Sequence, residues 1–197
     1  MKKETILAIA IIALLFLLPF KLFAYNIYIW QQINPEIDTA KAKEIILFIN
    51  YQNELKSFSE KEVSHMKEVW VLYWTFNMIF YISLFTIACF FFQKAKVDWI
   101  GALKKSGEIL LGISVSLILF VLFLFNFAFT LFHQLFFSKN SWIFDSNSLL
   151  VKMLPQEFFF MIATIILTTI IIESLLLLFY SRYIYKTKNV GYTKRKQ

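Results

Sequence analysis

The chain contains only two histidines, His65 and His133. Imidazole is the side chain whose ordinary pKa lets it give and take protons near neutral pH. When the hydrophobic segments are laid into a bilayer, both histidines fall at the same edge of the membrane. A histidine at a membrane interface also serves as an amphipathic anchor, and this alternative stays open. Two histidines at one interface, each beside polar neighbours, form a candidate site for proton transfer.

Each histidine has polar neighbours at helical spacing. Glu62 lies three residues before His65 on the same helix face, where a carboxylate can orient the imidazole ring and raise its basicity. Asn126 and Thr130 share the face of His133 and form a polar stripe in a helix otherwise rich in Phe and Leu. Polar groups at that depth are costly to expose to lipid, so we expect the stripe to face the bundle interior.

The composition is that of an integral membrane protein. Of the 197 residues, 59% are hydrophobic and 19% are aromatic, which exceeds what a soluble domain needs for its core. Crossing a bilayer as a helix takes about 20 residues. Four segments are long enough: residues 6–25, 69–92, 109–132 and 157–180. We therefore predict an all-α integral membrane protein with four transmembrane helices, forming a single domain over residues 1–197.

The lysines and arginines predict how the chain is oriented. Of the 20, 12 lie in three short segments: at the N-terminus, between the second and third spans, and after the fourth. Positive charge favours cytoplasmic loops. Both termini are thus predicted to be cytoplasmic, and residues 26–68 and 133–156 to form two structured extracellular loops. The basic tail suits anionic lipid headgroups. Nucleic acid binding is not expected, because the basic residues are split among segments.

The first outer loop is predicted to contain two helix starts. Asp38 or Thr39 can cap a helix that runs to about Leu55, with apolar residues at helical spacing. This helix is expected to lie on the membrane surface. Ser59 and Glu62 form a capping box. A second helix is therefore predicted to start there and to run unbroken into the second span.

Several other residues favour roles outside catalysis. Trp30 and Trp142 are expected in the aromatic belt at the membrane interface, and Lys21 is expected to snorkel outward from the first span. Cys89 is expected to be a small buried side chain in the second span. Glu173, inside the fourth span, is either a proton relay or the partner of a nearby lysine or hydroxyl group.

Metal and covalent chemistry find little support in the sequence. Glu62, His65, His133 and Asp145 can in principle form a zinc site, but they lie far apart and no His-Glu-x-x-His motif is present. No metal and no cofactor are therefore expected. The chain also lacks a Gly-x-Ser-x-Gly motif, and four glycines do not make a phosphate-cradling loop.

The two outer loops carry segments that resemble a known family. In the second loop they are Phe132-His133-Gln134-Leu135-Phe136-Phe137, then Trp142, Phe144, Asp145, Leu149, Leu150, Pro155, Phe158 and Phe159. In the first loop they are Asn50-Tyr51, Phe58-Ser59, Glu62, His65-Met66 and Glu68-Val69. Together with the length and the order of spans, they resemble the lipoprotein intramolecular transacylases, a family of small four-span bacterial membrane proteins.

The resemblance implies a substrate and a reaction. Such enzymes act on a lipoprotein whose N-terminal cysteine carries a diacylglyceryl thioether and a free α-amine. They move the sn-2 acyl chain to that amine, which gives an N-acyl S-monoacylglyceryl (lyso) lipoprotein. The resemblance also implies a multi-pass protein of the bacterial cell membrane with its active site at the extracellular face. We expect a monomer whose partners are diacylglyceryl-modified lipoproteins and membrane lipids.

The resemblance gives the catalytic role to His65 and His133. In this hypothesis His133 is the base, with Asn126 or Thr130 beneath it. His65, oriented by Glu62, is the acid or stabilises the oxyanion, although the two histidines can exchange these roles.

Three further residues of the matched segments, Glu68, Trp142 and Asp145, are expected to support the site or to bind substrate. Two alternatives belong to other functional classes. One is a non-enzymatic assembly factor or sensor that uses the outer loops as a binding surface. The other is a lipid or peptide hydrolase.

Overall fold

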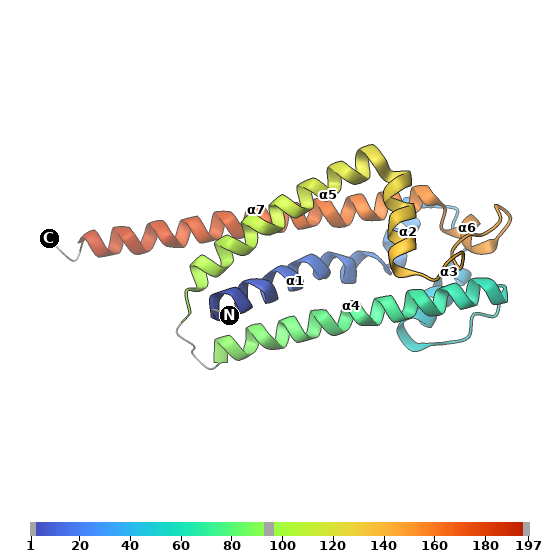
Figure 1. Ribbon diagram of the computed structural model, residues 1–197, viewed down its shortest axis with the longest axis horizontal. Helices are drawn as coiled ribbons and strands as arrows, with labels where there is room; N and C mark the ends of the chain where they lie inside the picture. The colour runs from blue at the N-terminus through green and yellow to red at the C-terminus, as the bar shows by residue number, and fades with distance from the viewer. Residues whose placement is uncertain (1–2, 93–96, 195–197) are drawn as a thin grey trace. The chain divides into compact units, whose positions relative to one another are not determined.

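The computed structural model describes residues 3–92 and 97–194, and the regular structure in this part of the chain is helical (Figure 1). The helices are, in chain order, α1 (Lys3–Phe23), α2 (Ile27–Ile33), α3 (Thr39–Tyr51), α4 (Glu60–Phe92), α5 (Trp99–Phe136), α6 (Leu149–Met153) and α7 (Gln156–Lys194). Four of them, α1, α4, α5 and α7, are long and apolar enough to cross a membrane. The predicted all-α fold with four membrane-crossing helices is confirmed.

The predicted orientation of the chain stays a prediction. Five of the basic residues that support it lie outside the described residues: Lys2, Lys94, Lys96, Arg195 and Lys196. Three of the long helices, α4, α5 and α7, extend past the predicted spans, whereas α1 begins earlier but ends two residues short of its predicted span. About 20 residues cross the hydrocarbon layer. Their extra turns carry the polar residues that flank each apolar segment.

The chain divides into two compact units, which we describe separately. Unit 1 contains the described residues of Met1–Pro19, Met78–Leu117 and Leu167–Gln197, and unit 2 contains Phe20–Asn77 and Ile118–Ile166. Each of the four long helices contributes a segment to each unit. A single domain over residues 1–197 stays a prediction. Every residue predicted for the catalytic site belongs to unit 2.

Unit 1 is held together by close helix contacts at small residues. The buried Ser106 hydroxyl donates to the carbonyl oxygen of Ala102 at 2.8 Å and lies 3.2 Å from that of Ala8. A Cβ added to Gly107 would lie 2.9 Å from Cγ of Leu178, so only glycine permits this approach of α5 to α7. Small residues of this kind let membrane helices pack closely.

Glu173 and Cys89 both lie in unit 1. Oε2 of Glu173 is buried and has no hydrogen-bond partner among the described residues. A relay role and a pairing role for Glu173 both stay predictions. Cys89 is a free cysteine. It is half-buried, and is therefore less buried than the sequence predicted.

Unit 2 contains the capped outer helix α3. The Asp38 side chain accepts hydrogen bonds from the first backbone N–H groups of the helix. The bond from the backbone of Lys41 holds the pKa of the Asp38 carboxyl below its ordinary value. The helix ends before the predicted Leu55, because Gln52 takes the left-handed conformation (φ 56°) that closes many helices.

The apolar face of α3 is buried in the core of unit 2. This core also includes residues of α2, α4, α6 and α7: Trp30, Met66, Leu150 and Phe158. The four buried residues of α3 are Ala42, Ile45, Phe48 and Ile49. The expectation that α3 lies on the membrane surface is therefore wrong in one respect: its apolar face contacts protein, not lipid.

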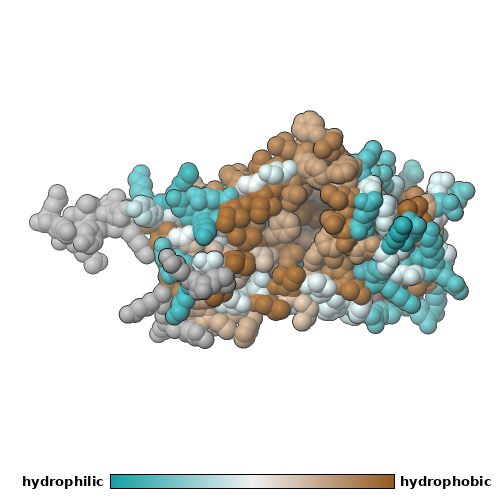
Figure 2. All heavy atoms as spheres, in the orientation of Figure 1, coloured by the Kyte–Doolittle hydropathy of each residue, from teal (hydrophilic) through white to brown (hydrophobic). Residues whose placement is uncertain are grey.

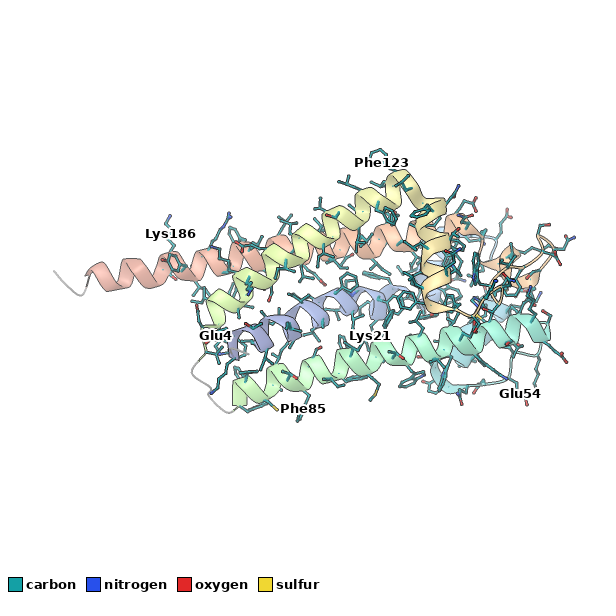
Figure 3. The ribbon with its side chains drawn as sticks, viewed as in Figure 1. Glu4, Lys21, Glu54, Phe85, Phe123 and Lys186 are labelled. Atoms are coloured by element: carbon teal, nitrogen blue, oxygen red, sulfur yellow. The ribbon has the colours of Figure 1, made fainter. Side chains whose placement is uncertain are left out.

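Two polar anchors also differ from expectation. Trp30 is buried in the core, and its Nε1 donates to the carbonyl oxygen of Ala24 at 2.8 Å, so it is not a belt residue. Lys21 lies on α1 (Figure 3). Its Nζ donates to Oδ1 of Asn77 on α4 at 2.6 Å. A lysine satisfied inside the protein does not need to snorkel outward.

A kink in α5 is the main feature of unit 2 that the sequence did not predict. Leu124 has non-helical backbone angles (φ −133°, ψ 36°), and α5 bends sharply along its yellow part in Figure 1. Phe123 beside it is 79% exposed and points outward (Figure 3). The stretch after the kink carries Asn126, Thr130 and His133 as one helical segment.

The visible surface of unit 2 is divided into a hydrophilic part and a hydrophobic part (Figure 2). Hydrophilic residues gather over its loops and short helices, whereas hydrophobic residues cover its segments of the long helices (Figure 2). The exposed apolar side chains of these segments include Val71, Phe127, Phe132 and Phe136. An apolar surface of this kind suits contact with lipid.

The core of unit 2 predicts a contrast between two positions of α3. Ile49→Ala should lower the free energy of unfolding by about 2 to 5 kcal/mol, because Ile49 is fully buried. Leu47→Ala, at a position that is 42% exposed, should change it by about 0.5 kcal/mol or less. Thermal unfolding in one mild detergent compares the two variants. Equal losses would show that the face of α3 is not buried as described.

Candidate active site

The site begins with the capping box at the start of α4. The backbone N–H and the hydroxyl of Ser59 both donate to Oε2 of Glu62 at 2.8 Å, and the Glu62 N–H lies 3.4 Å from the Ser59 hydroxyl. From this start α4 runs unbroken to Phe92. The predicted capping box and continuous helix are confirmed. They place His65 about one turn after Glu62.

The second oxygen of Glu62 holds another part of the chain. Oε1 accepts hydrogen bonds from the hydroxyl of Ser148 and from the backbone N–H of Leu150, the latter at 2.8 Å. The Glu62 side chain is buried, and its four donors replace the water that a carboxylate requires. Glu62 thereby ties the start of α4 to the start of α6.

The carboxylate beside His65 is that of Glu68. Its Oε2 lies 3.6 Å from Nδ1 of His65. Glu68 also accepts hydrogen bonds from the Ser138 N–H at 3.3 Å and from the Ser141 hydroxyl at 2.6 Å. The hydrogen bonds of Glu62, in contrast, go to Ser59, Ser148 and Leu150. The carboxylate beside the His65 ring is therefore that of Glu68, and not that of Glu62 as the sequence predicted.

The two histidines meet in unit 2. The ring centroids of His65 and His133 are 6.2 Å apart, and the ring planes are within 23° of parallel. Both side chains are buried. Phe137 and Phe144 pack on His65 in T-shaped geometry, with ring centroids at 4.7 and 5.6 Å. Residues distant in the sequence thus form one aromatic enclosure around the pair.

The backbone fixes the protonation of one ring. Nδ1 of His133 lies 2.7 Å from the carbonyl oxygen of Phe129, one turn earlier. A carbonyl oxygen only accepts, so we assign the proton to Nδ1. In the neutral ring Nε2 then carries a lone pair and can accept a proton. Phe129 and Trp142 flank this ring, with centroids at 4.1 and 4.8 Å.

Three predicted residues take other positions. Asn126 is exposed, and its Oδ1 accepts a hydrogen bond from Nε2 of Gln156 at 2.9 Å, so it does not turn inward as expected. Thr130 is half-buried. The side chain of Asp145 is exposed, while its backbone carbonyl accepts from the Ser148 N–H.

The residues available for a metal site are few. Among the described residues, no three His, Cys, Asp or Glu side chains are grouped so that they could hold a metal ion. The oxygens of Glu62 are already taken by protein donors. What the arrangement can do is move protons between two imidazoles and a bound substrate.

Sequence reasoning missed some residues that build the site. Phe137 and Phe144 belong to the matched segments, but their contacts with the histidine were not foreseen. Phe129 supplies a backbone oxygen, which any residue type provides. Ser138 and Ser141 bind Glu68 from a loop without a periodic pattern. The one sequence signal for Phe129 is its helical spacing, because a residue four positions before His133 lies one turn away on the same helix face.

The fold and the site together define a multi-pass α-helical membrane protein with a buried pair of histidines. Residues 4–159 match the family described as lipoprotein intramolecular transacylase Lit. The match covers more than half of the chain. The chain therefore belongs to this family, and it is an acyltransferase that performs intramolecular transacylation on lipoproteins.

Solved structures support the fold. The chain is similar to lipoprotein intramolecular transacylase Lit from Bacillus cereus, with a TM-score of 0.81 and 20% identity over 95% of this chain and 96% of that one. Two variants of that protein, with one histidine replaced by arginine or by alanine, give TM-scores of 0.72 at 19% identity. They cover 96% and 95% of this chain, and 93% and 94% of theirs. A comparison with curated proteins gives no match.

Family membership decides between the alternatives of the sequence analysis. A non-enzymatic assembly factor or sensor is excluded, because the family consists of acyltransferases. The name of the family also gives lipoproteins as the substrate class.

The bonds of Glu62 predict a cost for Glu62→Gln. A glutamine side chain has only one oxygen, so its amide NH₂ must face either the Ser59 N–H or the Leu150 N–H, in whichever orientation it is placed. Leaving a buried donor unsatisfied costs about 1 to 3 kcal/mol of stability. Thermal unfolding in detergent measures this loss.

Glu54→Gln is the matched control for that loss. Glu54 pairs with Lys56 through side chains that are both about 80% exposed, and such a surface pair contributes about 1 kcal/mol or less. If Glu62→Gln were as stable as Glu54→Gln, the four bonds to Glu62 would not hold the loop.

Proposed function

We propose that this chain moves the sn-2 acyl chain of a diacylglyceryl-modified lipoprotein to the α-amine of its N-terminal cysteine by proton transfer between His133 and His65. The product is an N-acyl S-monoacylglyceryl lipoprotein. The observation that carries the proposal is the buried, near-parallel pair of imidazoles, 6.2 Å apart between centroids. This spacing suits one reacting centre that exchanges protons with both rings.

The chemistry sets the number of protons to be moved. The amine nitrogen attacks the ester carbonyl carbon, a C–N bond forms, and the bond from that carbon to the glycerol oxygen breaks. The electron pair of the broken bond goes to the glycerol oxygen, which needs a proton. The α-ammonium loses two protons on the way to the amide. One proton reaches the glycerol oxygen in exchange through the histidines, and the other leaves to water.

His133 is assigned as the base. The carbonyl oxygen of Phe129 holds the Nδ1 proton, so the lone pair of the neutral ring is on Nε2. Such a nitrogen accepts the proton that the amine loses as the C–N bond forms. In this assignment the backbone oxygen takes the supporting role that was expected of Asn126, which binds Gln156, whereas a role for Thr130 stays a prediction.

His65 is assigned as the acid that protonates the leaving glycerol oxygen or stabilises the oxyanion. Burial, together with the nearby His133, holds the pKa of His65 below its ordinary value, against the smaller attraction of the Glu68 carboxylate 3.6 Å from Nδ1. The ring is therefore neutral before substrate binds, and its N–H can donate to a developing negative oxygen. The different neighbours of the two rings support different proton tasks.

The substrate supplies its own nucleophile. The amine and the ester belong to one molecule, and the attack closes an eight-membered ring through sulfur and glycerol. Intramolecular attack has a high effective concentration and replaces an enzyme nucleophile. This agrees with a chain that lacks the usual nucleophile motifs and keeps its one cysteine in unit 1, away from the histidines of unit 2 in the sequence.

Orientation and assembly complete the proposal. The basic segments favour cytoplasmic termini, which puts residues 26–68 and 133–156 with the histidines at the extracellular face. Lipoprotein acyl chains at that face extend into the bilayer, next to the apolar surface of unit 2. We infer a monomer in contact with membrane lipids, without a metal, cofactor or nucleic acid.

The proposal is tested in cells that lack this activity. With the wild-type chain, mass spectrometry of an N-terminal lipopeptide should show the acyl chain on nitrogen, with the total mass unchanged. His65→Asn and His133→Asn should each lower the transfer rate by a factor of about 100 or more, because each removes a proton carrier. Asparagine at 133 still offers an N–H to the Phe129 oxygen.

Glu54→Gln, at an exposed position, is the control for expression and should transfer normally. Undiminished transfer by either histidine variant would disprove the two-histidine mechanism and leave the family activity intact. Release of free fatty acid or a cleaved peptide by the wild type would instead identify a hydrolase.

A further inference from the structure

The proposed reaction begins with a cation. The α-amine of an N-terminal cysteine is mostly protonated at pH 7, because the ordinary pKa of such a group is about 7.7 to 8.0. The histidines are buried among Phe137, Phe144 and Trp142. A cation that enters such surroundings loses hydration, which is costly unless an anion compensates it. The site therefore needs a carboxylate within reach of the substrate.

Two carboxylates lie within one turn of His65, and only one is available. The Glu62 side chain is buried, and its oxygens accept four bonds from the protein. The Glu68 side chain is 26% exposed and accepts bonds from Ser138 and Ser141. A carboxylate offers about four lone-pair sites. Glu68 thus keeps the capacity to accept from a ligand.

A second, independent feature lies at the same place. The His65 side chain is 7% exposed, and its buried Nδ1 has no hydrogen-bond partner, since Glu68 at 3.6 Å is beyond hydrogen-bond distance. Buried polar atoms are nearly always hydrogen-bonded, so an unpaired Nδ1 indicates that a ligand supplies its partner. One ammonium group can donate both to Nδ1 of neutral His65 and to the Glu68 carboxylate.

The charges around Glu68 leave it free for this role. Within residues 3–92 and 97–187, Glu68 forms no ion pair with a lysine or arginine. The nearby cation Lys61 donates to the carbonyl oxygen of Ile143 and lies 5.2 Å from the centroid of the Phe144 ring. The titratable group beside Glu68 is His65, and its hydrogen-bond donors are the neutral Ser138 and Ser141.

We propose that Glu68 binds the α-ammonium group of the lipoprotein substrate and, with Nδ1 of His65, selects lipoproteins whose N-terminus is free. The inference rests on the proposed function and adds the residue that recognises the amine. With Nδ1 of His65 accepting from the substrate, the proton of the neutral ring is on Nε2, which suits donation to the oxyanion. The amide of the product is uncharged, so Glu68 binds the substrate in preference to the product.

The test uses two lipopeptides that cannot react. Both carry two alkyl chains on glycerol through ether bonds in place of esters; one has a free α-amine and the other is N-acetylated. Binding to the full-length protein in detergent is measured by calorimetry at pH 6.5. The wild type should prefer the free amine by a factor of about ten or more, as expected for a charge-assisted hydrogen bond.

The variants separate recognition from structure. Glu68→Gln should bind the two lipopeptides equally, with unchanged affinity for the N-acetylated one, and Glu68→Asp should recover part of the preference. Ser141→Ala removes a bond to Glu68 but keeps the carboxylate, so it should retain the preference. In the wild type the preference should fall as pH rises past 9, where the ammonium loses its charge.

Each contrary outcome has a separate meaning. Equal binding of both lipopeptides by the wild type would overturn the role of Glu68 and leave the proposed function in place. A loss of affinity for both lipopeptides in Glu68→Gln would assign Glu68 only to holding the Ser138 and Ser141 loop, which also overturns the inference. Binding of neither lipopeptide by the wild type would overturn the inference and the proposed function together.

Discussion

The site depends on the burial of one charged side chain, Glu62. A carboxylate removed from water is costly unless donors surround it, and Glu62 has four. Two come from Ser59, just before α4, and two from Ser148 and Leu150, at the start of α6. The loop between α5 and α6 is therefore held against α4, and this loop supplies three of the aromatic rings that enclose the histidines, Phe137, Trp142 and Phe144. Without that tie, the helices alone would not bring these rings together.

Features that depend on local sequence could be predicted. Hydropathy and length indicate the four long helices, because every backbone group in lipid needs a partner inside the helix. The capping box and the Asp38 cap act over three residues and are readable for the same reason. The kink at Leu124 could not be predicted, because no proline or glycine stands near it in the sequence. The burial of Trp30 could not be predicted either, since Trp30 packs against residues far away in the sequence, such as Phe158.

The choice of carboxylate shows where sequence reasoning reaches its limit. Glu62 and Glu68 stand three residues before and three after His65, so helix geometry puts both within reach of its ring. Donors far away in the sequence make the difference: Ser148 and Leu150 engage Glu62, whereas Glu68 keeps an oxygen 3.6 Å from His65. A helical pattern names candidates for a site, but the loops packed on the helix decide among them.

The aromatic enclosure answers a problem posed by the proposed chemistry. Histidines that activate an amine can also activate water, and water attack on the ester would release fatty acid instead of moving it. Phe137 and Phe144 cover His65, while Phe129 and Trp142 flank His133. Such rings leave little room for water beside the imidazoles. The amine of the substrate is then the nucleophile that remains, because it is delivered on the same molecule as the ester. Exclusion of water and an intramolecular amine thus give transfer its advantage over hydrolysis.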